Sequence, residues 1–176
     1  IPLRLVGSEM CIRDSPVTEL VYGVDLVEEM IKVAANQSVS LTQRDIKIEG
    51  WAIESRIYAE DPFRNFLPSV GRLIKYAPPT ELDNKLFKLR NDTGVYEGAK
   101  VSIYYDPMIA KLCVWANDRK AAIEGMRGAL DDFDISGVNT NLPFLSAVME
   151  NSKFEEGNFS TAFISEHFPD GFDYLI

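Results

Sequence analysis

The first regular pattern of apolar residues has the period of an α-helix and begins at residue 25. Asp25 can cap this helix, and Glu28, three residues later, completes a pair of the capping-box type. The apolar positions fall on one helical face: Leu26, Val27, Met30, Ile31 and Val33. The pattern predicts a helix that ends near Asn36, followed by a polar connector over residues 37–43.

From residue 51 the period changes to two, which is typical of a half-buried strand. One face carries Trp51, Ile53, Ser55, Ile57 and Ala59. The other face carries Ala52, Glu54, Arg56 and Tyr58. The sequence Glu60-Asp61-Pro62 ends the predicted strand.

Further along the chain, strands and helices follow one another without regular alternation. Strands are predicted over residues 72–76, 86–90, 108–116 and 134–138, and residues 95–97 form either a short strand or a turn. Asp118 caps a predicted helix over residues 119–133. Two more helices begin near Asn141, where Pro143 fits the first turn, and at Ser160. This order predicts an α+β fold, with an antiparallel sheet and flanking helices.

Composition narrows the class of protein. The 176 residues, 46% of them hydrophobic, suffice for one domain or two small ones. A net charge of -9 argues against a nucleic-acid-binding surface, and no apolar run approaches the length of a membrane span. Two cysteines, Cys11 and Cys113, and one histidine, His167, provide neither a disulfide framework nor a Cys/His metal site. The cysteine usage favours a reducing compartment, with Cys113 as a small buried apolar residue.

Residues 1–15 do not fit the pattern of the rest. They show no clear period and stop abruptly at Pro16, and residues 6–15 look like translated sequencing-adapter sequence. We therefore expect residues 1–15 to be an anomalous leader and an artefact, outside the folded domain.

Arg56 is the strongest candidate for chemistry. Glu54 and Arg56 lie on the same face of an otherwise apolar strand, and buried charge without a partner is costly. One interpretation is an ion pair on a solvated face. The other is an anchor for an anion or a developing oxyanion, for which the planar, always charged guanidinium is suited.

Two runs, EGWAIESRIYAEDPFRNFLP at residues 49–68 and YYDPMIAK at residues 104–111, resemble the C-terminal subdomain of biotin carboxylase, an ATP-grasp enzyme. The resemblance covers residues 16–172, and residues 173–176 are then a truncated tail. It implies a ligase that phosphorylates bicarbonate with ATP and transfers the resulting carboxyl group to biotin. The parent enzyme would use ATP, Mg²⁺ and biotin on a carrier domain, and the isolated piece should bind none of them tightly.

The resemblance also implies roles for individual residues. Arg56 matches the arginine close to the biotin ureido oxygen, where it would stabilise charge that develops on deprotonation. Arg90 and Asp106 match positions toward a homodimer contact, with a local salt bridge as the alternative. Thr161 matches a position near the adenine of ATP, although Ser160 or Thr161 could simply cap a helix.

Several parts of that enzyme have no counterpart in the sequence. There is no GxxxxGK[ST] phosphate loop, and the ATP-gripping lysines, the Gly-rich lid and the two magnesium-binding glutamates of the family precede this region. Residues 9–15 replace the family's Arg-Xaa-Gln-Val-Glu-His, which holds the bicarbonate-binding arginine and the catalytic base. The biotin-carrying Met-Lys-Met motif and the carboxyltransferase half are also missing. We expect a fragment that is inactive alone and whose partners are the N-terminal and central domains, a biotin carboxyl carrier domain and a carboxyltransferase β-chain.

Within the family, residues 50–54, 90–98 and 141–149 look most like α-chains of propionyl-CoA carboxylase. Acetyl-CoA, methylcrotonyl-CoA and pyruvate carboxylases remain open, because a partner domain chooses the acyl substrate. Two other functions stay open: a non-catalytic packing or dimerisation module, and a different ATP-grasp ligase such as a carboxylate–amine ligase. Bacterial cytoplasm and mitochondrial matrix both fit.

Overall fold

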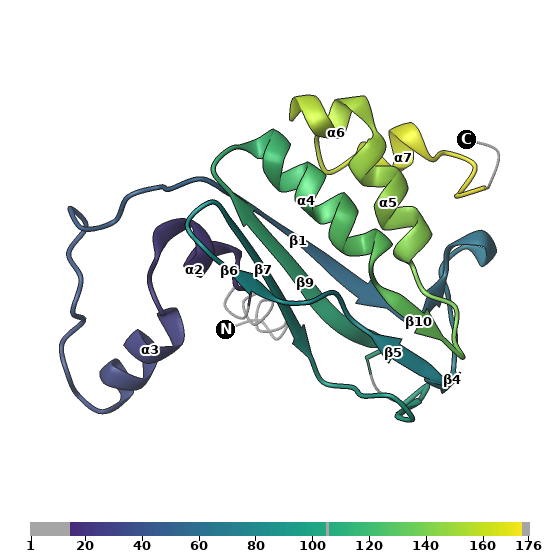
Figure 1. The fold of residues 1–176 in the computed structure, drawn as a ribbon, viewed down its shortest axis with the longest axis horizontal. Helices are drawn as coiled ribbons and strands as arrows, with labels where there is room; N and C mark the ends of the chain where they lie inside the picture. Colours follow the sequence, from purple (N-terminus) through teal and green to yellow (C-terminus); the bar gives the residue numbers. More distant parts are fainter. Residues whose placement is uncertain (1–14, 105, 174–176) are drawn as a thin grey trace.

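The computed structural model describes residues 15–104 and 106–173 of the chain (Figure 1). The predicted leader falls outside the described residues except for Ser15, and so does the predicted tail except for Asp173. Cys11 and Tyr105 also lie outside them.

The centre of the fold is a four-stranded antiparallel sheet in the order β1-β9-β7-β6. Its strands are β1 (Trp51–Tyr58), β9 (Met108–Ala116), β7 (Phe87–Thr93) and β6 (Leu82–Asp83). β9 lies between β1 and β7, with Val114 opposite both Ile53 and Leu89. The fold is thus α+β, as predicted, and β9 has the predicted bounds.

Helices cover one face of this sheet (Figure 1). They are α4 (Arg119–Asp131), α5 (Leu142–Glu150), α6 (Ser152–Glu156) and α7 (Phe163–His167). Asp118 caps α4 as predicted, and its carboxylate accepts a hydrogen bond from Ala121 N at 2.9 Å. The buried core lies between this helical layer and the sheet. It includes Ile53, Ile57, Leu112, Val114, Ile123, Met126, Leu130, Phe144 and Val148.

The strand predicted over residues 72–76 is wrong in one respect, because the chain changes its pairing partner within it. β4 (Gly71–Arg72) pairs with β8 (Lys100–Val101), whereas β5 (Lys75–Ala77) pairs with β10 (Asp134–Ser136). The change occurs at two adjacent residues. Leu73 N donates to Ala99 O, and Ile74 N donates to Ser136 O. Residues 95–97, left open as strand or turn, do not form a strand.

β2 (Glu60–Asp61) and β3 (Leu67–Pro68) form a small hairpin around the 3₁₀ turn η1 (Pro62–Arg64). β1 therefore does end where Glu60-Asp61-Pro62 begins. The buried Asp61 carboxylate fixes this hairpin, because it accepts hydrogen bonds from Phe63 N at 3.1 Å and from Asn139 Nδ2 at 2.8 Å.

Short helices account for most remaining differences. α2 (Val17–Tyr22) was not predicted, and it ends at Gly23, whose φ of 65° is readily adopted by glycine. α6 was also missed, and α7 begins at Phe163 rather than at Ser160. A helix of five or six residues spans too few turns to show a helical period.

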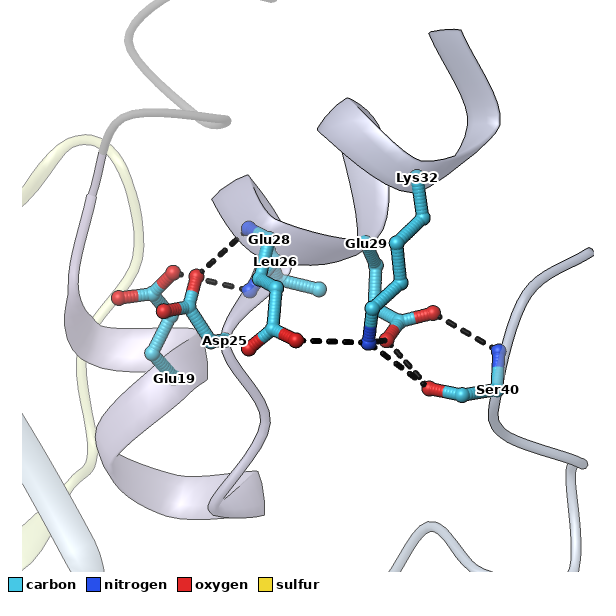
Figure 2. Close-up of polar contacts among 7 residues, drawn as sticks. All are labelled: Glu19, Asp25, Leu26, Glu28, Glu29, Lys32 and Ser40. Carbon is cyan, nitrogen blue, oxygen red and sulfur yellow. Dashed lines mark hydrogen bonds and ion pairs between the residues drawn. The ribbon is translucent and has the colours of Figure 1, made fainter. Parts of the chain in front are cut away.

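α3 (Leu26–Ala34) confirms the first predicted helix, and Asp25 accepts a hydrogen bond from Glu28 N at 2.8 Å. Figure 2 shows how this helix holds the connector that follows it. The Glu29 carboxylate accepts a hydrogen bond from Ser40 N at 2.9 Å and pairs with Lys32, also at 2.9 Å. The ion-paired hydrogen bond from Lys32 and the bonds from Ser40 lower the pKa of Glu29 to about 2.

Candidate functional site

The face of the sheet turned away from α4 carries charge on all three long strands. Residues directly opposite in an antiparallel pair share a face, so the register sorts them into rungs. In one rung Arg56 of β1, Lys111 of β9 and Asp92 of β7 lie side by side. The neighbouring rung holds Glu54, Cys113 and Arg90. We call these six residues the charged face.

Arg56 is fixed by Glu54. Its Nε lies 2.6 Å from Glu54 Oε1, a short distance of the kind found in charge-assisted hydrogen bonds. The side chain of Glu54 is 10% exposed and that of Arg56 is 31% exposed. The ion pair of the first interpretation is therefore formed, but it is half-buried and water screens it only in part.

On the β7 side of the charged face, Arg90 pairs with Asp92. It makes two hydrogen bonds to Asp92, with Nε to Oδ1 at 2.7 Å and a terminal nitrogen to Oδ2 at 2.9 Å. These bonds to Asp92 raise the pKa of Arg90. Its other terminal nitrogen lies 3.6 Å from Glu19 Oε2, and Glu19 Oε1 accepts from Leu26 N at 3.0 Å (Figure 2). Arg90 therefore links the sheet to α2 and to the start of α3.

Cys113 lies between Glu54 and Arg90 within its rung. Its side chain is fully buried, and burial, followed by the charge of Glu54, raises the pKa of the thiol. A thiol that stays protonated is a poor nucleophile. The prediction of a buried apolar cysteine is confirmed.

Asp106 lies away from Arg90, at the beginning of β9, where its carboxylate accepts a hydrogen bond from Met108 N at 2.9 Å. Arg90 is opposite Cys113, in the second half of the same strand. The two residues are therefore not neighbours within one chain. Arg90 does form local salt bridges, but with Asp92 and Glu19 rather than with Asp106. Burial, followed by the negative charge of Asp106, raises the pKa of Glu60 at this end of β9.

Residues 54–166 match the family described as the biotin carboxylase C-terminal domain. This match includes both arginines of the charged face and spans more than half of the chain. The chain belongs to this family.

Relatives with known names agree with the match. The chain is 57% identical to the propionyl-CoA carboxylase alpha chain of Ruegeria pomeroyi over 91% of its own length, and 48% identical to the human mitochondrial protein of that name over 90%. It spans only 26% and 21% of the length of those two proteins.

A solved structure gives the same result for the fold. The biotin carboxylase domain of Hydrogenobacter thermophilus 2-oxoglutarate carboxylase, a dimer in complex with MgADP and bicarbonate, superposes with a TM-score of 0.84 at 39% identity. The match covers 93% of this chain and 35% of that one.

In this biotin carboxylase C-terminal domain, Thr161 and His167 lie apart from the charged face. Thr161 is exposed and lies two residues before the start of α7, in the helical layer. Ser160 Oγ accepts a hydrogen bond from Ala162 N at 3.1 Å, so the start of this turn uses Ser160 rather than Thr161. His167 packs against Phe163, with ring centroids 4.7 Å apart.

No pattern in the sequence indicated the role of Asn141. It was predicted only as the beginning of a helix, yet its side chain is buried against the open edge of β1. Asn141 Oδ1 accepts from Tyr58 N at 2.8 Å, and Asn141 Nδ2 donates to Arg56 O at 3.0 Å. These contacts fix the backbone from which Arg56 projects.

The domain thus presents the Arg56 guanidinium, held in place by Glu54, to which an anionic group could bind. Among residues 15–104 and 106–173, no group of three His, Cys, Asp or Glu side chains is placed to bind a metal ion. Within the same described part of the chain, no helix is both long and apolar enough to cross a membrane.

Proposed function

We propose that this chain is the C-terminal part of a biotin carboxylase that carboxylates biotin with ATP and bicarbonate, and that Arg56 serves that reaction directly. The observation that carries the proposal is the half-buried Arg56 guanidinium, held at 2.6 Å by Glu54 within the matched region. Biotin supplies the ureido nitrogen that accepts the carboxyl group. Arg56 would stabilise the negative charge that develops on the ureido oxygen.

Arg56→Ala in the full-length carboxylase tests this role. We expect biotin-dependent ATP hydrolysis to fall about 100-fold or more, the usual effect of removing one such donor. ATP hydrolysis without biotin should change much less, because Arg56 acts only on the biotin step. Glu150→Gln, which alters an exposed ion pair with Arg127 in the helical layer, is the control. Unchanged biotin-dependent hydrolysis in Arg56→Ala would refute the proposal.

ATP and Mg²⁺ are proposed as cofactors of the parent enzyme, and biotin on a carrier domain as its substrate. Support comes from the MgADP and bicarbonate in the 2-oxoglutarate carboxylase structure. Among the described residues, no group of three His, Cys, Asp or Glu side chains is placed to bind the magnesium. We further propose that exposed Thr161 lies near the adenine. Thr161→Ala should then weaken ATP binding by the full-length enzyme and leave the affinity for biotin unchanged.

Propionyl-CoA is the proposed acyl substrate, with a biotin carboxyl carrier domain and a carboxyltransferase β-chain as partners. The 57% and 48% identities to propionyl-CoA carboxylase alpha chains support this choice. One of these relatives is bacterial and the other is described as mitochondrial, which supports a location of the parent enzyme in a bacterial cytoplasm or a mitochondrial matrix. Enzyme purified with its β-chain should carboxylate propionyl-CoA faster than acetyl-CoA or methylcrotonyl-CoA, and the reverse order would contradict the proposal.

We also propose that Arg90 and Asp106 contribute to a homodimer contact. Both side chains are exposed, and the similar 2-oxoglutarate carboxylase domain is described as a dimer. The two residues lie near different ends of β9, so a partner copy would have to contact an extended surface. Sedimentation of the full-length Arg90→Ala variant should show more monomer than the unaltered protein.

As a second candidate, the chain alone acts as a packing module for the rest of the parent. α3 exposes an apolar stripe of Val27, Met30, Ile31 and Val33. A groove of about 340 Å³ runs beside it and is lined by Tyr22, Leu26, Val39 and Ile46. The proposed occupant is the remaining polypeptide of the biotin carboxylase domain, because this chain covers only 35% of a solved domain.

A further inference from the structure

The two oxygens of the Glu54 carboxylate contact different parts of the chain. Oε1 lies 2.6 Å from Arg56 Nε, whereas Oε2 accepts a 2.7 Å hydrogen bond from Ser15 Oγ. Cys113 Sγ lies 3.9 Å from Oε2. With a side chain only 10% exposed, Glu54 is positioned by Arg56 and Cys113 rather than by water, whereas Ser15 belongs to the segment expected to be an artefact.

The nitrogen that Glu54 contacts determines the effect of the contact. Nε is the guanidinium nitrogen bonded to the aliphatic stem of Arg56, so a hydrogen bond there restricts rotation of the whole planar group. A long arginine side chain without such a restraint samples many rotamers. The contact at Nε therefore sets the directions in which the terminal nitrogens of Arg56 point.

We propose that Glu54 is a positioning residue that orients Arg56 for the reaction. The inference rests on the proposed function, because it concerns the same guanidinium. A developing oxyanion is stabilised by donors that already point toward it, and misplacing a reacting group by about 1 Å can lower a rate about 100-fold. Glu54 acts through Arg56 and does not touch the substrate.

A double-mutant cycle in the full-length carboxylase tests this. Biotin-dependent ATP hydrolysis is measured for the unaltered enzyme, Glu54→Gln, Arg56→Ala and the double variant. Glu54→Gln should lower kcat about 10- to 100-fold when Arg56 is present, with little change in KM for ATP. In the Arg56→Ala background it should cause no further loss. An equal fold loss in both backgrounds would show a role independent of Arg56 and would overturn the proposal.

Two more variants distinguish a loss of Arg56 positioning from a loss of folding. Glu150→Gln makes the same change in the exposed Arg127–Glu150 pair and should keep full activity. Glu54→Asp keeps the charge but is one methylene shorter. It should fold, as judged by thermal unfolding, yet turn over more slowly, and full activity in Glu54→Asp would contradict a positioning role.

The outcomes separate this inference from the proposed function. If Arg56→Ala retains activity, the function proposed for Arg56 fails. If Arg56→Ala is impaired while Glu54→Gln is fully active, only the positioning role of Glu54 fails.

Discussion

The side-chain amide of Asn141 donates a 3.0 Å hydrogen bond to the backbone oxygen of Arg56, a residue 85 positions earlier in the chain. The same amide accepts from Tyr58 N at 2.8 Å. β1 is an edge strand, so these two backbone groups have no neighbouring strand on that side. Asn141 takes the place of such a strand at the point where Arg56 projects.

Asn141→Ala should therefore destabilise the chain by about 1–3 kcal/mol, because it leaves buried backbone groups of β1 unsatisfied. Urea unfolding of the variant and of the unaltered chain measures the difference. Asn158→Ala, at an exposed position, should change stability by less than about 0.5 kcal/mol. Equal stability of Asn141→Ala and the unaltered chain would mean that water replaces the amide without loss.

The lowered pKa of Glu29 predicts a pH dependence for the contact between α3 and the connector. Its pKa falls from an ordinary value of 4.5 to about 2, chiefly through its bond with Lys32. Because the folded pKa is depressed, the stabilisation is complete above about pH 4.5 and disappears as the pH falls toward 2. An NMR titration should show the Glu29 carboxyl carbon changing near pH 2 and the Ser40 amide resonance following it.

Glu28 provides the control for that titration, since it also pairs with Lys32 but belongs to the exposed side of the helix. Glu28→Gln should leave the Ser40 amide dependent on pH, whereas Glu29→Gln should abolish the dependence. A Glu29 midpoint near 4.5 would show that the contacts with Ser40 and Lys32 are not formed in solution.

Two glycines of α4 should respond to alanine in opposite directions. A Cβ on Gly125 would lie 2.2 Å from a ring carbon of Phe87 and 3.1 Å from Val114 Cγ1, whereas one on Gly128 would meet nothing within 4 Å. Gly125→Ala should destabilise the chain by about 1–3 kcal/mol through overpacking. Gly128→Ala should stabilise it by roughly 0.5–1 kcal/mol, because alanine favours the helix. Urea unfolding that gave both variants the same sign would contradict the packing of α4 on the sheet.

The exposed stripe of α3 should make the isolated chain self-associate. Ile31 is 64% exposed within this stripe, so Ile31→Lys should lower the fraction of oligomer in sedimentation velocity. Ile74, 71% exposed near the other end of the sheet, offers a matched Ile74→Lys control that should have little effect. If both substitutions reduce association equally, the stripe has no special role.

The sequence predicted those parts of the fold that local pattern determines. The alternation in β1 placed Glu54 and Arg56 on one face, and Asp118 marked the beginning of α4. The rungs of the charged face could not be derived in this way, because they depend on how β9 pairs with β1 and β7. Arg56 is the candidate that the sequence identifies, but its restraint by Glu54 at Nε and the support from Asn141 depend on the folded arrangement of the chain.

The break between β4 and β5 shows a different limit. Nothing in the side chains of Leu73 and Ile74 marks the residue at which the backbone leaves one partner for another. That change depends on where residues 99 and 136 lie, and both are distant in sequence. Local propensity indicates an extended segment there and is silent about its hydrogen-bonding partners.

The opposed faces of β1 also bear on how the chain reaches a single structure. If β1 slid by one residue against β9, every side chain would change faces. Glu54 and Arg56 would then enter the apolar layer beneath α4, while Ile53 and Ile57 would meet water. Such a misaligned intermediate would carry desolvated charge and could not persist. Glu54 and Arg56 thus disfavour wrong alignments of β1 with β9 during folding, in addition to any role with a substrate.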